Sequence, residues 1–318
     1  MVLEHPKRGP EVVEKTMGLL WNVVEDTITA TPKYNLFGTA RGRQLGTPLV
    51  EMSVDQVLQQ EISRLTLLRL AAQTYDKLAY ILGPLMLACK VLSSRACELA
   101  SVKEMEMSLK ERDPGFVKVC QTFILCMRRA GEIIPFDRCW IAEGYKFIGV
   151  VTSLDGGRCG YGITTHILAE KEKEEGDEKS ELRRGLVITR SKICKRSIPS
   201  HESLAGKLGT EALSDLLQPL LFDHGDLDLI LPFKSDSTCF LAMLNPQVEL
   251  KNVLLQNSVE AFKEDLRRIS ISFPKAVLTV GHIVGTCNPA DTMTKIFKDP
   301  IAVINSSLYR QGPANFAS

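Results

Sequence analysis

The 318-residue sequence has no hydrophobic run long enough for a membrane span. Its longest apolar stretch, residues 78–89, is shorter than the roughly 20 residues that a transmembrane helix needs. The first ten residues are mostly polar and lack the apolar core of a secretory signal. The nine cysteines are odd in number and never show Cys-x-x-Cys spacing, which argues against a disulfide framework or a zinc site. The sequence therefore predicts an intracellular protein, cytoplasmic or nuclear, with reduced thiols and no membrane partner.

An excess of charge of one sign is also absent. Lys and Arg total 39 against 38 Asp and Glu, which leaves a net charge of +1. This balance gives no global electrostatic argument for nucleic-acid binding, so any such function must rest on a local site. With 44% hydrophobic and 24% charged residues, the composition is that of a folded chain with one large or two medium domains.

Several catalytic motifs are missing. His201-Glu202 has no second histidine at H-E-x-x-H spacing, and neither G-x-S-x-G nor G-x-x-x-x-G-K occurs. The triplet 236–238 (DST) lacks the third-position glycine of an aspartic protease. No Asp-Asp pair occurs, so the Tyr-x-Asp-Asp motif of polymerases is absent and the chain cannot copy nucleic acid by itself.

Hydrophobic periodicity predicts a mainly helical region followed by a mixed α/β region. In the first region we expect short strands within 18–35 and helices near 53–68, 84–111 and 114–130. In the second we expect strands at 145–154, 160–169, 186–191, 227–233 and 276–280. Helices are expected there near 202–217, 237–245 and 256–270, with a final helix from about 289. The charged segment 170–185 is interpreted as a solvated hairpin tip. The predicted fold class is α/β, a mixed sheet with flanking helices after a helical segment.

Four acidic residues fall at predicted strand ends or helix starts, namely Asp155, Glu202, Asp236 and Asp291. An α/β sheet places functional groups at its strand ends, so these carboxylates are candidates for one shared site. Carboxylate oxygens suit Mg²⁺ or Mn²⁺, and two such ions about 3.5–4 Å apart clamp the attacking and leaving oxygens of a phosphodiester displacement. The alternative is that Glu202 and Asp291 act only as charges and caps at helix starts.

Residues 65–92 (LTLLRLAAQTYDKLAYILGPLMLACKVL) combine a helix, a Tyr-Asp turn and a Pro-initiated apolar helix ending near a lysine. This pattern resembles the segment after the polymerase palm in Pao/BEL-type LTR retrotransposon polyproteins. The matching residues are Tyr75, Asp76, Leu78, Pro84 and Lys90, while Lys77 and Ala79 replace a Pro and a Gly. Residues 17–21 (MGLLW) and 33–36 (KYNL) are similar to an earlier strand of that family and its sequel.

Four later motifs continue in the same order and resemble the ribonuclease H domain of that family. They are residues 154–157 (LDGG) with 160–162 (GYG), 198–202 (IPSHE), 235–238 (SDST), and 282–284 (HIV) with 288–291 (NPAD). Two positions depart from the family pattern: Gly157 replaces a usual Ser or Thr, and Ser200 replaces a usual Arg.

The resemblance implies a ribonuclease H-like domain at 136–318 behind a mainly helical, reverse-transcriptase-derived thumb/connection segment at 1–135. It implies that Asp155 bridges two Mg²⁺ or Mn²⁺ ions, that Glu202 and Asp236 share one ion and that Asp291 holds the other. The implied substrate is an RNA–DNA hybrid, and an upstream polymerase domain is a further implied partner.

Six other residues are candidates for roles around this site. His282 is a candidate proton shuttle for the leaving group, or else a structural loop histidine. Ser237 and Thr238 either donate to a substrate phosphate or cap a helix. The nearest basic cluster either contacts a hybrid or is simply solvated, and it consists of Lys192, Lys195 and Arg196.

Two functional hypotheses follow. The first is a metal-dependent ribonuclease H that hydrolyses the RNA of RNA–DNA hybrids, and the four carboxylates favour it. The second is a catalytically inactive retroelement remnant that acts as a nucleic-acid or protein interaction module, and the near-neutral charge and missing polymerase favour it. In either case the chain is expected to be a fragment of a longer polyprotein or a host protein derived from one.

Overall fold

The structure is a computed structural model that describes residues 13–16, 19–30, 34–36, 47–74, 76, 81–97, 114–137, 144–171, 181–221 and 228–312. Parts of the sequence predictions lie outside these residues. They are 17–18, 33, 75 and 77–79 of the resemblance motifs, 98–111 of a predicted helix, and 172–180 of the charged segment. Within the described part of the chain, no helix combines the length and the apolar character that a membrane crossing requires.

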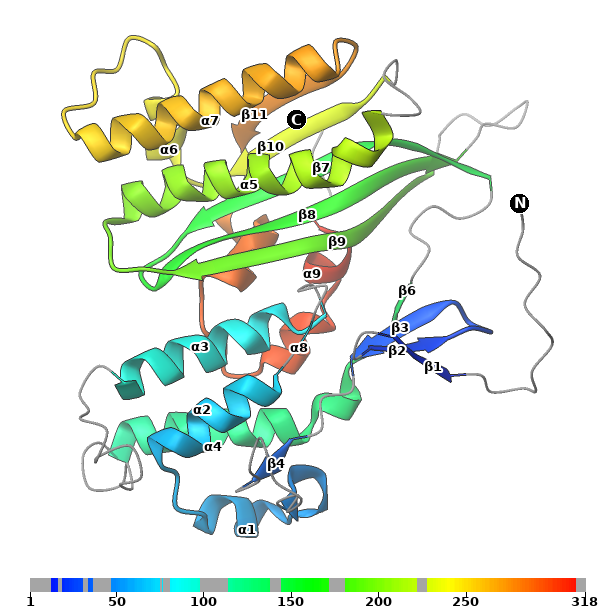
Figure 1. Cartoon of the computed structure of the whole chain (residues 1–318), viewed down its shortest axis with the longest axis vertical. Coiled ribbons are helices and arrows are strands. Elements are labelled where there is room, and N and C mark those ends of the chain that lie inside the picture. Colours follow the sequence, from blue (N-terminus) through cyan, green and yellow to red (C-terminus); the bar gives the residue numbers. More distant parts are fainter. Residues whose placement is uncertain are drawn as a thin grey trace.

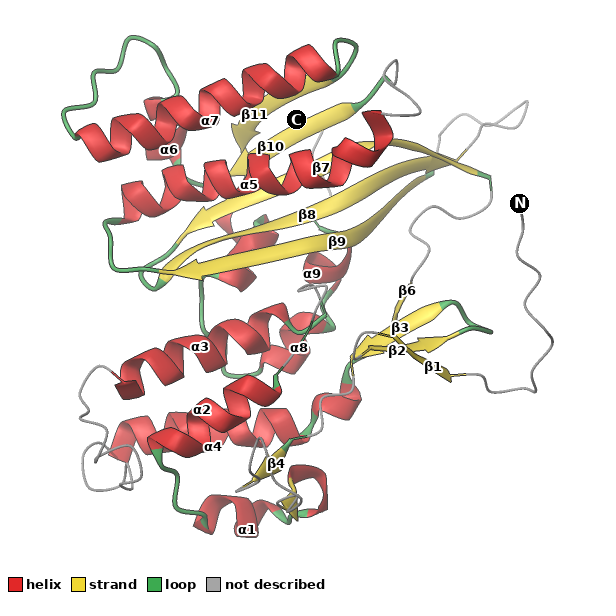
Figure 2. Ribbon diagram, in the orientation of Figure 1, coloured by secondary structure: helices red, strands yellow, loops and turns green. Residues whose placement is uncertain are grey.

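A five-stranded mixed sheet with the order β11-β10-β7-β8-β9 organises the C-terminal region (Figures 1 and 2). Its strands are β7 (Tyr145–Gly156), β8 (Gly160–Lys171), β9 (Leu182–Ile193), β10 (Ile230–Ser235) and β11 (Val277–His282). Strand β8 is antiparallel to both of its neighbours, β7 and β9, whereas β10 runs parallel to both β7 and β11. Strand β7 lies at the centre, and its β-branched run 150–152 (VVT) is fully buried, as expected for a strand covered on both faces.

Helices cover both faces of this sheet. Two long helices, α5 (Ile198–Leu221) and α7 (Val253–Ser272), pack together over one face, where Phe233, Phe240 and Phe262 form an aromatic cluster (Figure 1). A short helix, α6 (Thr238–Met243), follows β10. The opposite face is covered by the C-terminal segment. The predicted fold class, an α/β mixed sheet with flanking helices after a mainly helical segment, is confirmed.

Some boundary predictions are wrong. The single helix expected near 53–68 is divided into two, Val54–Gln59 and Arg64–Gln73. The final helix expected from about residue 289 is three pieces: η6 (Pro289–Met293), α8 (Pro300–Ile304) and α9 (Ser307–Gln311). Pro300 disfavours helix in the residue before it, and Asp299 and Ser306 each cap a new helix start. Strand β9 begins at Leu182 rather than 186, so residues 182–185 of the supposed hairpin tip are paired with β8.

In its described residues the N-terminal region contains a small antiparallel sheet and four α-helices. The sheet has the order β1-β2-β3-β6 and consists of β1 (Val13–Thr16), β2 (Leu19–Asn22), β3 (Thr27–Ala30) and β6 (Phe136–Asp137). A separate pair joins β4 (Asn35–Leu36) and β5 (Thr47–Pro48). The helices are α1 (Val54–Gln59), α2 (Arg64–Gln73), α3 (Gly83–Cys97) and α4 (Pro114–Arg128). The Asp76 carboxylate accepts the backbone N–H groups of Ile81 and Leu82 just before α3, at 2.6 and 2.9 Å.

One hydrophobic cluster has members on both sides of residue 135. It joins buried residues of α2, α3 and α4 to Met293, Ile301, Ile304 and Tyr309 of the C-terminal segment. Gly83, at the start of α3, lies so close to this segment that a Cβ atom there would meet the Tyr309 hydroxyl at 2.7 Å. The Arg129 guanidinium forms an ion pair with Asp299 at 2.9 Å. The division at residue 135 stays a prediction.

We expect Gly149→Ala to destabilise the sheet. A Cβ atom at Gly149 would lie 2.0 Å from the backbone oxygen of Ile230, so β7 and β10 would have to separate. The expected loss is about 1–3 kcal/mol in the free energy of unfolding, measured by urea denaturation. Gly131→Ala is the matched control, because a Cβ atom there meets nothing within 4 Å. Equal stability of the two variants would contradict this packing account.

Candidate functional site

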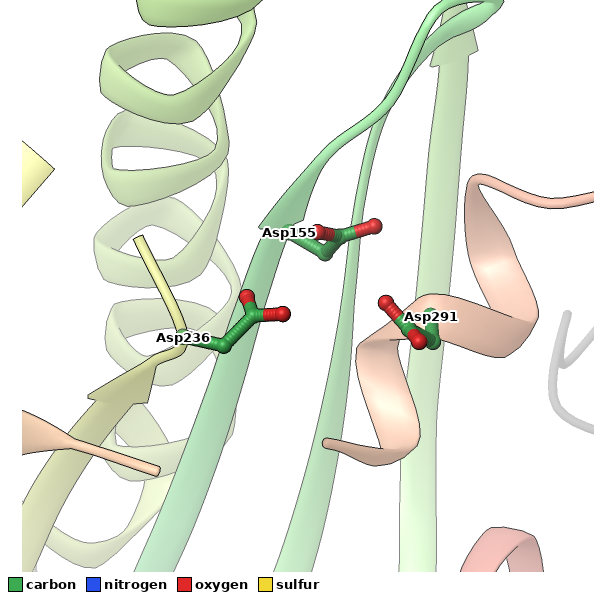
Figure 3. Close-up of side chains that lie close together, drawn as sticks. All are labelled: Asp155, Asp236 and Asp291. Atoms are coloured by element: carbon green, nitrogen blue, oxygen red, sulfur yellow. The ribbon is translucent and has the colours of Figure 1, made fainter. Parts of the chain in front are cut away.

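The parallel strands deliver their acidic residues to one edge of the sheet. Asp155 is the penultimate residue of β7, and Asp236 directly follows the neighbouring strand β10. Asp291 comes from η6, on the face opposite α5 (Figure 1). Figure 3 shows the three carboxylates pointing toward a common centre. One carboxylate oxygen of each residue lies within 4.8 Å of those of the other two.

Glu202 completes the set from the opposite side of Asp155. It is the fifth residue of α5, just past the first turn, and lines, with Asp155 and Asp236, a cavity of about 550 Å³. Its side chain is buried, and among the described residues Oε2 has no hydrogen-bond partner. The structure therefore brings all four predicted carboxylates to one place, although Glu202 stands outside the tightest group of three.

Gly156 sets the distance between β7 and α5. A Cβ atom at Gly156 would lie 2.5 Å from the backbone nitrogen of Glu202, so only glycine permits this approach. The backbone N–H of Gly156 donates to the Glu202 carboxylate. One residue earlier in α5, the buried His201 donates its Nδ1–H to the carbonyl of Gly157 at 2.7 Å. These contacts hold the end of β7 and the start of α5 in one arrangement.

Asn288 orients Asp236. Its buried amide donates to Asp236 Oδ1 and to the carbonyl of Leu154, both at 3.0 Å, and so ties the loop before η6 to β7 and β10. Its side-chain oxygen accepts the backbone N–H of Ala290 at 3.1 Å and starts η6. One side chain therefore fixes Asp236 and the beginning of the element that carries Asp291.

The end of η6 supplies two further polar contacts. The Thr294 hydroxyl donates to Asp155 Oδ2, and the Lys295 ammonium forms an ion pair with Asp291 Oδ2. Asp291 Oδ1 has no hydrogen-bond partner among the described residues.

Burial and mutual repulsion make these carboxyl groups weak acids. Burial raises the pKa of Asp155 to about 7, with Asp291 and Asp236 adding to the effect and the Thr294 hydrogen bond opposing it. Burial raises the pKa of Glu202 to about 8, reinforced by the charges of Asp155 and Asp236. Burial also raises the pKa of Asp291, against the effect of Lys295. Without a cation, part of the site holds protons at neutral pH.

The structure places His282 and the serine-threonine pair differently from the carboxylates. His282 ends β11 opposite Ser235, on the same sheet edge, but it is exposed and does not line the cavity. Ser237 lines the cavity and also caps α6, since its hydroxyl accepts the backbone N–H of Phe240 at 3.1 Å. Thr238 is exposed and outside the cavity lining. Roles for His282, Ser237 and Thr238 in catalysis or substrate binding remain predictions.

The predicted basic cluster lies beside the cavity rather than in it. Lys192, Lys195 and Arg196 are exposed at the end of β9 and in the loop before α5. The basic side chains that line the cavity are Arg158 and Lys295 instead. Contact of the predicted cluster with nucleic acid remains a prediction.

Sequence reasoning missed the roles of Asn288, Thr294 and Lys295. A signal was present for the last two, because Thr294 and Lys295 follow Asp291 by three and four residues, the spacing at which side chains meet on one helical turn. The departure at Gly157 now has a physical reason. A Cβ atom there would lie 3.0 Å from Thr294 Cβ, so a side chain at 157 would crowd the hydroxyl that donates to Asp155.

Comparisons with known proteins give structural similarities only. No protein-family model and no curated protein matches the sequence. Similar solved structures include ribonuclease H1 of Halobacterium salinarum (16% identity, 44% of this chain, 89% of that chain, TM-score 0.29). Others are the N-terminal RNase H domain of rv2228c from Mycobacterium tuberculosis (12%, 49%, 96%, 0.28) and LC11-RNase H1 in complex with an RNA/DNA hybrid (17%, 45%, 92%, 0.25). These TM-scores are low, so the description of the sheet rests on its own strand order and strand directions.

We expect the stability of the cation-free protein to fall as pH rises from about 4 to about 8. The unfolded chain ionises Asp155 and Glu202 near pH 4, whereas the folded state keeps their protons until pH 7–8. Asp155→Asn removes one such group, so at pH 8 in EDTA it should be more stable than wild type by roughly 2–4 kcal/mol.

The measurement is urea denaturation in EDTA at several pH values. The advantage of Asp155→Asn should shrink as the pH falls toward 4, because the carboxyl of the unfolded chain then regains its proton as well. Asp228→Asn is the matched control, because Asp228 is exposed and outside the cavity. A constant difference across pH would show that Asp155 titrates normally.

Proposed function

We propose that this protein is a divalent-cation-dependent nuclease that hydrolyses the RNA strand of RNA–DNA hybrids. The observation that carries the proposal is the convergence of Asp155, Asp236 and Asp291, whose carboxylate oxygens lie within 4.8 Å of one another, beside a cavity that Asp155, Asp236 and Glu202 line. The unpartnered buried Glu202 Oε2 is the observation that a cap or surface charge does not explain. Hard carboxylate oxygens at this spacing fit Mg²⁺ or Mn²⁺.

In the proposed site Asp155, Glu202, Asp236 and Asp291 would together hold the cations. When bound, such ions activate the attacking water and stabilise the leaving oxygen of a phosphodiester. The chain's own contribution is orientation: Thr294 holds Asp155, the Gly156 N–H holds Glu202, and Asn288 holds Asp236. These donors are neutral, so they position the carboxylates without cancelling their charge.

The hybrid substrate and the retroelement origin rest on the resemblance of the motifs to Pao/BEL polyproteins. On this proposal residues 136–318 are the nuclease and residues 1–135 a thumb/connection segment that positions the duplex, with an upstream polymerase domain as a partner. The hydrophobic cluster shared by α2–α4 and the C-terminal segment supports a fixed placement of the two parts. The contact between α3 and η6 supports the same placement.

We expect the purified chain to cleave a fluorescently labelled RNA–DNA hybrid in Mn²⁺ or Mg²⁺. Asp236→Asn and Asp155→Asn should each lower the cleavage rate at least about 100-fold, because each removes a charged cation ligand. EDTA should abolish cleavage, and Asp228→Asn should leave it unchanged. Gel analysis of the RNA strand gives the rate and the cut positions.

Failure to cleave the hybrid with either cation would overturn the nuclease proposal. Tight binding of the hybrid without cleavage would instead support the inactive interaction module. Equal cleavage of double-stranded DNA would overturn the substrate class while leaving cation-dependent hydrolysis in place.

We expect His282→Gln to lower the turnover number about 100-fold if His282 transfers a proton to the leaving group. The Mn²⁺ affinity and the thermal midpoint should not change, because His282 is exposed and lies outside the cavity lining. Unchanged turnover would show that His282, the last residue of β11, takes no part in the reaction.

A further inference from the structure

Lys295 is positioned inside the proposed cation site rather than beside it. It lines the cavity with Asp155, Glu202 and Asp236, and its ammonium forms an ion pair with Asp291 Oδ2. It follows Asp291 by four residues, so the pair forms within one turn at the end of η6. In the structure one of the four carboxylates, that of Asp291, is therefore already paired with a lysine ammonium.

The burial of the two partners is unequal. The Lys295 side chain is 55% exposed, whereas that of Asp291 is 18% exposed. A long flexible side chain with half its surface in water can exchange partners without disturbing the core. Asp291 cannot move in this way, because η6 is fixed by Asn288 and by the buried Met293. The mobile half of the ion pair is the lysine.

A phosphate of a bound nucleic acid would be an alternative partner for the Lys295 ammonium. Arg158 lines the same cavity, so its cationic residues are Arg158 and Lys295. A substrate phosphate that approaches the carboxylates would meet these two side chains. A lysine acts as a point charge toward a phosphate and needs no fixed geometry.

We propose that Lys295 is a built-in competitor for the second cation, released from Asp291 when its ammonium transfers to a phosphate of the nucleic acid. The proposal rests on the proposed function, since it assumes that Asp291 is a cation ligand. It predicts that the Asp291 side of the site gains affinity for a divalent cation when nucleic acid is bound. By linkage, the cation should strengthen nucleic-acid binding by the same factor.

The experiment titrates the full chain with Mn²⁺ alone, followed by calorimetry. Wild type should bind one Mn²⁺ more tightly than the second. Lys295→Met should bind the weaker Mn²⁺ about five- to tenfold more tightly than wild type, because no ammonium competes for Asp291. Lys298→Met is the matched control, an exposed lysine three residues further on that does not line the cavity, and should match wild type.

A second arm repeats the titration with a duplex of 2′-O-methyl RNA and DNA, which lacks the free 2′-hydroxyls of RNA. In wild type this duplex should tighten the weaker Mn²⁺ site about fivefold or more, and in Lys295→Met it should change that site little. Lys295→Gln is the second variant should the methionine impair folding. It removes the charge, keeps a hydrogen-bond donor, and should behave like Lys295→Met.

The outcomes separate this inference from the proposed function. Wild type that binds no Mn²⁺ overturns both. Wild type that binds two Mn²⁺ ions while Lys295→Met and Lys295→Gln bind them equally well overturns only the role of Lys295. Tighter binding by both variants with undiminished coupling to the duplex supports competition but overturns transfer to a phosphate.

Discussion

Electrostatic repulsion among four partly buried carboxyl groups is the constraint on which the rest of the site depends. Burial raises the pKa values of Asp155, Glu202 and Asp291, so the fold holds these groups at a free-energy cost when they are ionised. Neutral groups donate hydrogen bonds to Asp155, Glu202 and Asp236. Among the described residues, Asp291 is the member of the four that forms an ion pair, with Lys295. A site that merely needed stability would replace this arrangement with paired or apolar groups. The arrangement therefore supports the proposed cation site.

Close backbone approach is what makes the convergence possible. The three parallel strands deliver Asp155, Asp236 and the β11 end to one edge, but Glu202 and Asp291 arrive from opposite faces of the sheet. Gly156 lets α5 touch the end of β7, and Gly157 leaves room for Thr294 on the other side. The two adjacent glycines thus permit close packing on both faces of the sheet. A Cβ atom at Gly156 would meet the backbone of α5, and one at Gly157 would meet the Thr294 side chain.

The N-terminal helices are part of the support for the site. Helix α3 packs on η6 and β9, and Gly83 at its start admits Tyr309 and Met293. Arg129 forms an ion pair with Asp299. The Arg310 guanidinium lies 3.9 Å from the centre of the Phe136 ring and donates a hydrogen bond to the carbonyl of Ile134. The segment that carries Asp291 is therefore packed between the sheet and the helical region. Its position depends on both.

The sequence by itself determined the fold class, the order of most elements and the identity of the four carboxylates. The alternation of apolar and polar residues in strands and short motifs such as 154–157 and 288–291 are local signals. They predict local structure because residues adjacent in the sequence are also adjacent in the fold. Only the tertiary structure decided which donors orient those carboxylates, that the last predicted helix is three pieces, and that β9 extends to Leu182. It also decided that Lys295, rather than Lys192, Lys195 and Arg196, lines the cavity. The physical reason is that Asn288–Asp236 and Thr294–Asp155 join residues 52 and 139 positions apart, and no local pattern encodes a contact at that separation.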